Sequence, residues 1–278
     1  MFQETTKKQA LYIGEISSEN GLCKLECRYK HNKRLAVIAH FLSSSLTTLE
    51  GPYTSYFNAE SKQSEGNYSN GKMDGVWKYW NEKGNLEDSI VYKQNKKIQA
   101  TYFYRFSNGN LSHETYTDKT SGIFKSITYT ESGQKKREML QIDTSFFIKT
   151  FLGNTIELDT FYIIKDTTKN KTDTTVFKHA EFQGGATAWA KFLMKKLNAN
   201  TPIDNGAPEG TYNVQTGFII LKNGEVEGVR AETDQGYGTE REVIQLIYST
   251  PNWVPATYKG KPANSYFKQP VTFIVQSN

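Results

Sequence analysis

The residue types that most often carry catalysis are few and scattered in this chain. The pair His113-Glu114 begins like a zincin motif, but no second histidine follows four residues later. There is no P-loop and no nucleophile elbow. We therefore predict a protein without enzymatic activity. The four histidines stand apart from one another in the sequence, at His31, His40, His113 and His179.

The two cysteines, Cys23 and Cys27, are four residues apart in a segment whose pattern predicts a strand. Four residues of strand span about 13 Å. A disulfide needs Cα atoms closer than about 7 Å. We therefore expect two free thiols, which are too few for a structural zinc site.

Two further patterns could suggest a cofactor or a metal. The run Gly236–Arg241 (GYGTER) resembles a dinucleotide fingerprint but has arginine where the third glycine belongs. Asp166 and Asp173 lie in a polar run without the closely spaced carboxylates and glycine of a calcium loop. We predict no cofactor and no bound metal.

The charge of the chain is close to balanced. Its 278 residues carry 34 basic and 29 acidic side chains, for a net charge of +5. The densest basic run, Lys135–Arg137, is too small for a nucleic-acid footprint, and we interpret it as a solvated face. We expect no nucleic-acid partner.

No segment of the sequence is long enough to span a membrane. The longest apolar stretch, Leu35–Leu42, has eight residues and includes a histidine, whereas a spanning helix needs about 20 apolar residues. The first ten residues contain no apolar signal-peptide core. If the protein is exported, we expect this sequence to be the mature form.

A repeat of 24 residues runs through residues 51–141. Each unit has an aromatic strand, a turn, a second strand and a further polar turn, which makes a β-meander. Such a unit cannot bury its aromatic face alone, so several must stack. The spacing is carried by one series, Tyr68, Tyr92, Tyr116 and Leu140, and by a second, Gly51, Gly75 and Gln99.

The unit at Gly66–Trp80 (GNYSNGKMDGVWKYW) resembles a MORN-type repeat of the kind found in YwqK-like bacterial proteins. This resemblance implies an interaction or spacer module. We interpret the aromatic residues as the packing face of the sheet rather than a ligand platform. Residues 1–50 read as a strand-rich leading region that could hold degenerate repeats.

Residues 142–180 form a connector. Two strands are predicted at Phe146–Phe151 and Ile156–Ile164. The polar run Lys165–Thr175 (KDTTKNKTDTT) has no periodicity and predicts a linker or exposed loop, with a domain boundary there or just after it.

Residues 181–278 predict a small domain of helices and strands. A helix begins near Gly184 and ends before Pro202, and an Asn-Gly turn at residues 223–224 joins two strands. The predicted order is helix, strand, strand, helix, strand, with one antiparallel sheet covered by helices. For the whole chain we predict the α+β class, with an all-β meander first. The later elements are expected at Gly210–Leu221, Val226–Ala231, Glu240–Tyr248 and Ser265–Val275.

This last region resembles the C-terminal domain of TonB-type energy transducers. The resemblance implies a periplasmic, cell-envelope location, a role in transport and recognition of TonB-dependent outer-membrane receptors. The chain has no transmembrane helix and no Pro-rich spacer, so coupling to the proton-motive-force motor is not predicted. The resemblance is carried, in order, by Ala180–Gly185, Gly210–Val214, Lys222–Gly224, Pro251–Pro255 and Lys268–Phe273.

The final strand is the candidate binding edge. Pro270 lacks an N–H and is tolerated on an edge strand, not in the middle of a sheet. An open edge can pair with an extended peptide by β-augmentation, and the resemblance places receptor capture on this strand. The predicted partner is a receptor peptide or another envelope protein. The predicted lining is Tyr266, Lys268, Gln269, Val271 and Phe273, with Phe273 partly in the core.

A different class of function stays open. The chain could be a structural envelope protein whose β-repeats bind cell wall, membrane or protein. The TonB-like domain would then serve for homodimerisation, and the edge would be closed by a second copy or by the connector strand.

Overall fold

The computed structural model describes residues 11–57, 61–162 and 177–276. Contacts divide the chain into two compact units, Met1–Phe124 and Lys125–Asn278. About 57% of the chain is in strands and 10% in helices, so the predicted α+β class is wrong and the protein is mainly β. No helix among the described residues is long and apolar enough to cross a bilayer.

The fold class differs because the meander outweighs the helices. Thirteen meander strands run for seven to ten residues each, whereas α1, α2 and α3 have 12, 4 and 10 residues. The repeats alternate aromatic or β-branched side chains with polar ones, which suits a pleated sheet. The predicted boundaries of the leading region, repeats, connector and C-terminal domain stay predictions.

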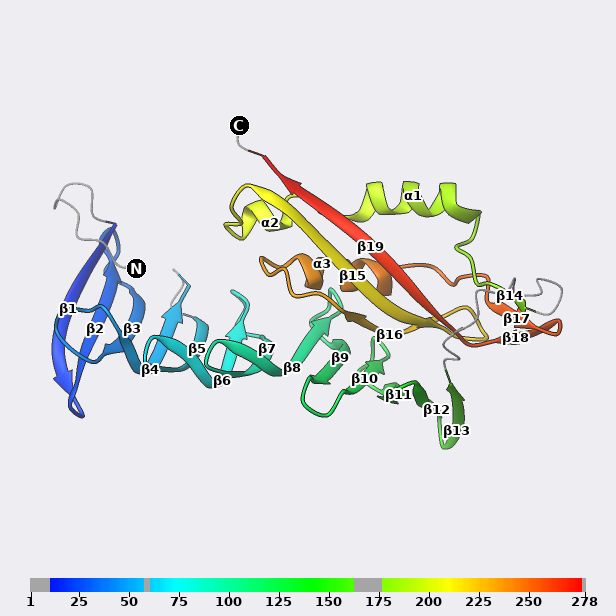
Figure 1. Cartoon of the computed structure of the whole chain (residues 1–278), viewed down its shortest axis with the longest axis horizontal. Coiled ribbons are helices and arrows are strands. Elements are labelled where there is room, and N and C mark those ends of the chain that lie inside the picture. The colour runs from blue at the N-terminus through cyan, green and yellow to red at the C-terminus, as the bar shows by residue number, and fades with distance from the viewer. Residues whose placement is uncertain (1–10, 58–60, 163–176, 277–278) are drawn as a thin grey trace. The chain divides into compact units, whose positions relative to one another are not determined.

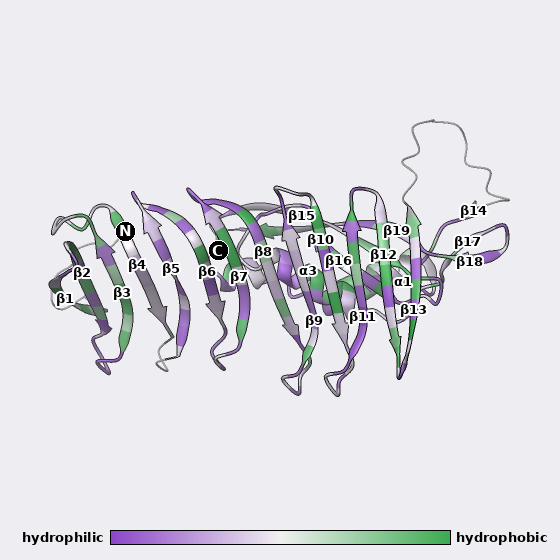
Figure 2. Ribbon diagram, turned by 90° about the horizontal axis from the view of Figure 1, so that it is seen from below, coloured by the Kyte–Doolittle hydropathy of each residue, from purple (hydrophilic) through white to green (hydrophobic). Residues whose placement is uncertain are grey.

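The first unit is a meander in which β1 to β9 each pair antiparallel with the next strand. Figure 2 shows these strands side by side, with apolar and polar residues mixed along each one. The strands are β1 (Tyr12–Glu19), β2 (Leu22–Tyr29), β3 (Leu35–Phe41), β4 (Leu49–Tyr56), β5 (Lys62–Ser69), β6 (Lys72–Trp80), β7 (Leu86–Lys93), β8 (Lys96–Arg105) and β9 (Leu111–Asp118).

Main-chain hydrogen bonds link each tight turn of this meander to the repeat before it. The turns at residues 70–71 and 94–95 have positive φ, which glycine and asparagine adopt most readily. In each case a turn N–H donates to a carbonyl at the start of an earlier strand. The bonds run from Gly71 to Leu49, from Asn95 to Met73 and from Lys119 to Ile98, at 2.8, 2.9 and 2.9 Å.

Acidic side chains reinforce the same links. Glu50 Oε2 accepts the Asn70 N–H at 2.6 Å, and Asp74 Oδ2 accepts the Gln94 N–H at 3.1 Å. Both the acceptors and the donors are 24 residues apart, so the spacing of the sequence is also the spacing of the hydrogen bonds. We call each carboxylate with its turn N–H an acid latch.

The aromatic side chains of the repeats pack on one another. Trp77 is 2% exposed and lies across Gly66, where a Cβ would come within 2.3 Å of the indole ring. The Trp77 indole N–H donates to the Asn67 carbonyl at 3.0 Å, and the Tyr68 ring meets it edge-on at 4.9 Å. Glycine at this position lets the tryptophan lie flat on the neighbouring strand.

The second unit holds the last strands of the meander and all the helices (Figure 1). Its meander strands are β10 (Ile123–Tyr129), which begins at the division, β11 (Lys135–Ile142), β12 (Ser145–Leu152) and β13 (Thr155–Tyr162). The elements that follow are β14 (Phe177–Lys178), α1 (Gly185–Lys196), α2 (Thr201–Asp204), β15 (Gly210–Ile220), β16 (Val226–Ala231), α3 (Thr239–Tyr248), β17 (Ala256–Tyr258), β18 (Lys261–Ala263) and β19 (Ser265–Val275).

These C-terminal strands form two small sheets, not the single sheet we predicted. One has the order β16-β15-β19 and the other β14-β17-β18. The second sheet was missed because its strands have only two or three residues, too short to show a period. Strand β13 ends within the predicted Ile156–Ile164 strand, and the polar run Lys165–Thr175, with Asp166 and Asp173, lies outside the described residues.

The helices pack on one face of the β16-β15-β19 sheet. Phe218 of β15 and Val243 and Ile247 of α3 are fully buried there. Trp253 adds an aromatic cluster with Phe218 and Phe267, with ring centroids 5.7 and 5.1 Å away. This burial fixes the positions of β15 and β19.

Candidate functional site

Strand β19 lies at the edge of its three-stranded sheet. All eleven of its residues pair with β15 without a register shift, from Gly210 opposite Val275 to Ile220 opposite Ser265. Among the strands that the structure describes, none pairs with the other side of β19 (Figure 1). The edge location expected from Pro270 is therefore found.

The hydrogen bonds of Gln215 show which groups of β19 face outward. The Gln215 N–H donates to Thr233 Oγ1 at 3.1 Å, and its carbonyl accepts the Glu232 N–H at 2.7 Å. Both groups thus point toward β16 and away from β19. Gln215 is opposite Pro270, so this is a non-hydrogen-bonded pair of the β15–β19 ladder.

Hydrogen-bonded and non-hydrogen-bonded pairs alternate along an antiparallel ladder. The next residue, Gln269, points its carbonyl toward β15, where the Thr216 hydroxyl donates to it at 2.9 Å. Alternate residues of β19 therefore turn their main-chain groups to the free edge, and all offer a carbonyl and, except for Pro270, an N–H. These outward residues are Tyr266, Lys268, Pro270, Thr272 and Ile274.

The five predicted lining residues divide into two sets. Tyr266 and Lys268 face outward, whereas Gln269, Val271 and Phe273 direct their main-chain groups to β15. The side chains of Val271 and Phe273 are buried under the helices, at 7% and 2% exposure, so Phe273 lies wholly in the core.

Sequence reasoning missed two outward residues, Thr272 and Ile274. Both side chains are exposed, and Ile274 is 62% exposed. The signal was present, because Pro270 marks the outward positions and every second residue from it shares them.

The first half of this edge is held by Glu232. Its carboxylate accepts hydrogen bonds from the Tyr266 hydroxyl at 2.5 Å and from Lys268 Nζ at 2.6 Å. Burial would raise the pKa of Glu232, but these two bonds outweigh it and lower that pKa. Burial and the bond to Glu232 together raise the pKa of Tyr266. Tyr266 crosses the strand at Gly217, where a Cβ would lie 1.9 Å from the tyrosine oxygen.

Helix α1 contributes aromatic rings near the middle of the edge. The Trp189 indole N–H donates to Gln269 Oε1 at 2.7 Å. Trp189 stacks on Phe192 at 5.8 Å and 13°, and both rings are half-buried. A strand added beside β19 would have one row of side chains toward these rings and the other toward Lys268 and Thr272.

The histidines have structural surroundings in the described chain. His40 Nδ1 lies 2.7 Å from the Pro52 carbonyl, and His113 stacks on Tyr104 at 4.1 Å. His31 and His179 each contact a neighbouring aromatic ring. Among the residues that the structure describes, no three histidine, cysteine or carboxylate side chains gather as a metal site would require.

Both cysteines, Cys23 and Cys27, lie on β2 and are free. Burial raises the pKa of the Cys27 thiol. A buried thiol of raised pKa forms little thiolate and is a poor nucleophile. The pair therefore supplies packing in the first unit.

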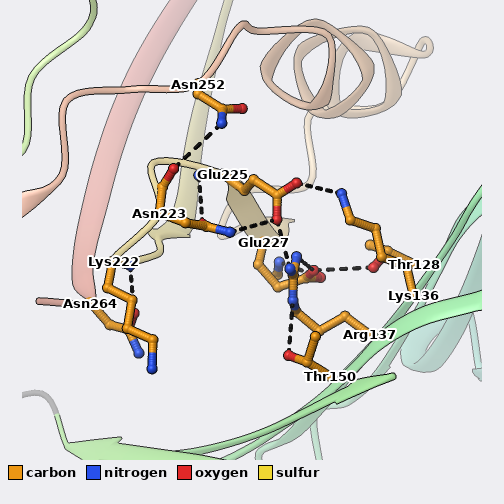
Figure 3. A network of polar contacts seen from close by, with 11 residues as sticks. Thr128, Lys136, Arg137, Thr150, Lys222, Asn223, Glu225, Glu227, Asn252 and Asn264 are labelled. Atoms are coloured by element: carbon orange, nitrogen blue, oxygen red, sulfur yellow. Dashed lines mark hydrogen bonds and ion pairs between the residues drawn. The ribbon is translucent and has the colours of Figure 1, made fainter. Parts of the chain in front are cut away.

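A buried ionic cluster in the second unit was also missed. Glu227 is fully buried and accepts hydrogen bonds from Ser126, Thr128 and Arg137 at 3.0, 3.2 and 3.4 Å. Arg137 is 5% exposed, so its interpretation as part of a solvated face is wrong. Its guanidinium also donates to Glu225 at 2.6 Å (Figure 3). This cluster fastens β16 to β10 and β11.

Glu225 links the cluster to the surface. Lys136 Nζ donates to its second oxygen at 2.5 Å, and Asn223 Nδ2 donates at 3.0 Å. Burial would raise the pKa of Glu225, but the bonds from Lys136 and Arg137 outweigh it and lower the pKa to about 2. Beside these residues is a cleft of about 290 Å³, lined also by Leu221, Lys222 and strands β12 and β13.

Comparison with known proteins adds no identity. No family model matches the chain, and no curated protein matches it. Among solved structures, the chain is similar to one in the crystal structure of a GtfA/B complex bound to UDP and GlcNAc. That match has 12% sequence identity and a TM-score of 0.14, and covers 54% of this chain and 24% of the other. A score this low supports no inference about fold or function.

Proposed function

We propose that this chain is a non-enzymatic protein-interaction module that binds an extended peptide at the free edge of β19. The observation that supports the proposal is the outward ladder of main-chain groups on that strand. Five carbonyls and four N–H groups, from Tyr266 to Ile274, face the edge. An added strand would satisfy them, as in β-augmentation.

Pro270 favours a foreign peptide over a second copy of β19. A foreign strand loses one hydrogen bond, because only β19 lacks a donor. Two copies paired through the middle of this edge bring in two prolines and lose two. Lys268 also discourages self-pairing centred on that position, because like charges directly opposite are destabilising. Homodimerisation through this strand is therefore the weaker candidate.

The partner follows from the resemblance to TonB C-terminal domains. We propose that the peptide belongs to a TonB-dependent outer-membrane receptor or another envelope protein, and that the chain works in the periplasm. The repeat unit would then act as an arm or a second contact surface. The ordered set of motifs from Ala180 to Phe273 supports this assignment.

The test uses Thr272, whose N–H faces the edge. The Thr272→Pro variant removes that donor and places a ring where the peptide would pair. The control, Thr272→Val, keeps the N–H and loses only the hydroxyl, which bonds to Asn213. Peptides from the periplasmic plug segments of receptors encoded in the same genome would be titrated in fluorescence anisotropy measurements.

We expect Thr272→Pro to weaken peptide binding by tenfold or more and Thr272→Val to change it less than about threefold. Circular dichroism would check that both variants stay folded. Equal affinity for a receptor peptide in the wild type and the folded proline variant would contradict the proposed edge. If no envelope peptide binds the wild type, the transducer-like assignment is wrong and a structural role replaces it.

A further inference from the structure

The last strand of the meander, β13, offers a second edge. It pairs antiparallel with β12 at eight consecutive positions, from Ser145 opposite Tyr162 to Leu152 opposite Thr155. In sheet order β13 is terminal, and no other described strand pairs with it. Both strands belong to the second unit.

The turn between β12 and β13 shows which groups face outward. Leu152 and Thr155 flank a two-residue turn, Gly153-Asn154, in which Gly153 has a φ of 61°. Residues that flank such a turn form a hydrogen-bonded pair. By alternation, Ile156, Leu158 and Thr160 direct their N–H and C=O groups to the free side. Unlike β19, this edge lacks no donor.

One face of this edge is apolar and exposed. Ile156 and Leu158 are 53% and 75% exposed, and Phe147 on the adjoining strand is 42% exposed. Side chains at alternate positions share a sheet face, and Phe147 is opposite Thr160, so the three residues lie together. Contiguous exposed apolar side chains on a soluble protein often mark a contact surface.

The other face of the edge is acidic. Glu157 and Asp159 point to the side of the C-terminal sheet, where they share one lysine, Lys222, at 3.4 and 3.5 Å. Asn264 Nδ2 also donates to Asp159 at 3.0 Å. Two carboxylates against one ammonium leave a net negative charge. Both carboxylates line the 290 Å³ cleft that also reaches Glu225.

We propose that the free edge of β13 binds an extended segment of a partner protein in which apolar and basic residues alternate. The main-chain groups of Ile156, Leu158 and Thr160 would pair with the segment. Its apolar row would cover Ile156, Leu158 and Phe147. Its lysine or arginine row would lie at the mouth of the cleft, beside Glu157 and Asp159.

Charge argues for a foreign partner over a second copy of β13. Antiparallel self-pairing centred on Leu158 sets Glu157 opposite Asp159 of the partner strand, and centring between Leu158 and Thr160 sets Asp159 opposite its own copy. Like charges facing each other across strands are destabilising. A basic row removes this repulsion and adds attraction. The proposal does not depend on the function assigned to β19.

The probe is a short fluorescein-labelled peptide of alternating valine and lysine, titrated into the full chain. We expect saturable binding that a valine and glutamate peptide fails to reproduce. The double variant Glu157→Gln, Asp159→Asn should weaken binding roughly tenfold. Asp204→Asn, which removes one negative charge on α2, should leave it unchanged. The Leu158→Pro variant, which removes an outward N–H, should weaken binding by a similar factor.

The variant Thr272→Pro separates the two edges. Valine–lysine binding that Thr272→Pro abolishes, or that the glutamate peptide matches, would contradict the β13 site. Absence of saturable binding would overturn it as well. A dimer in sedimentation velocity that the double variant strengthens would show self-pairing at β13 and overturn the proposal of a foreign partner.

Discussion

Glu227 is the residue on which the second unit most depends for internal order. Its carboxylate is fully buried and joins β16 to Ser126, Thr128 and Arg137. A buried ion pair adds little net stability compared with apolar residues of the same size. Removing one partner is costly, because it leaves a charge without its counter-ion.

We therefore expect Glu227→Ala to lower the free energy of unfolding by about 3 kcal/mol. The double variant Arg137→Met, Glu227→Leu should recover most of that loss, because no charge is then left alone. Urea denaturation of the full chain, followed by circular dichroism, measures both. Equal losses in the single and double variants would show that the ionic cluster matters only as packing volume.

Glu225 makes stability depend on pH. Its pKa is about 2 in the folded protein, below its ordinary value of 4.5. A carboxyl with a depressed folded pKa contributes stability above its unfolded pKa, and the contribution is lost as pH falls through the folded value. We expect up to about 3 kcal/mol to disappear between pH 5 and pH 2. Glu225→Gln should flatten the curve in this window, measured by urea melts at each pH.

Residue patterns predicted some of the site and missed the rest for a physical reason. Pro270 was enough to predict an edge strand, because the missing N–H excludes it from the sheet interior. Val271 and Phe273 were wrongly expected to line the edge. Which face a residue takes depends on the register with β15, and the outward set is known only from Gln215.

At the scale of elements, long periodic segments were predictable and short or buried-polar ones were not. The 24-residue spacing predicted the meander, and the acid latches now give it a cause. Glu225 and Glu227 follow an Asn-Gly turn and look like exposed charges. Their burial depends on β10 and β11, which lie about 90 residues away in the chain. The strands of the second small sheet were too short to carry a pattern.

The acid latch predicts a local effect on stability. Asp74 accepts both the main-chain N–H and the side-chain amide of Gln94, at 3.1 and 3.3 Å. Asp74→Ala should lower the stability of the first unit by about 1 kcal/mol, and Asp74→Asn, which keeps an acceptor, by less. The matched control is Glu82→Ala, in the turn at the other end of β6.

Hydrogen exchange checks where this effect occurs. Protection of the Gln94 and Asn95 amides should fall in Asp74→Ala, because their turn opens more often. Unchanged protection at these two amides would mean that the latch does not hold the turn closed.

At the scale of the whole molecule, the last hundred residues are packed on meander strands of their own unit. Besides the Glu227 cluster, Asn264 bonds to Asp159, and the Tyr266 ring lies 6.4 Å from Phe146. A protease cut within residues 163–176 would therefore separate two pieces that still share contacts. This bears on the fragment of about 100 residues that the polar run predicts.

We expect such a nicked protein to migrate as one species in gel filtration and to separate in denaturant. The Glu227→Ala variant should separate at a lower urea concentration, because the ionic cluster is broken. Mass spectrometry would confirm the cut. If the fragments part spontaneously in buffer, the contacts between residues 177–276 and β10–β13 are too weak to hold the unit together.

The acid latches also make the first unit a ruler. Each hairpin is joined to the one before by the same bonds, Gly71 to Leu49 and Asn95 to Met73, so a copied segment of 24 residues carries its own connections with it. Two added strands lengthen a sheet by about 9.6 Å. Duplicating or deleting one such segment would change the reach of the protein in fixed steps while leaving the chemistry at β19 untouched. Evolution could set the distance between a bound peptide and the far end of the repeats by counting hairpins.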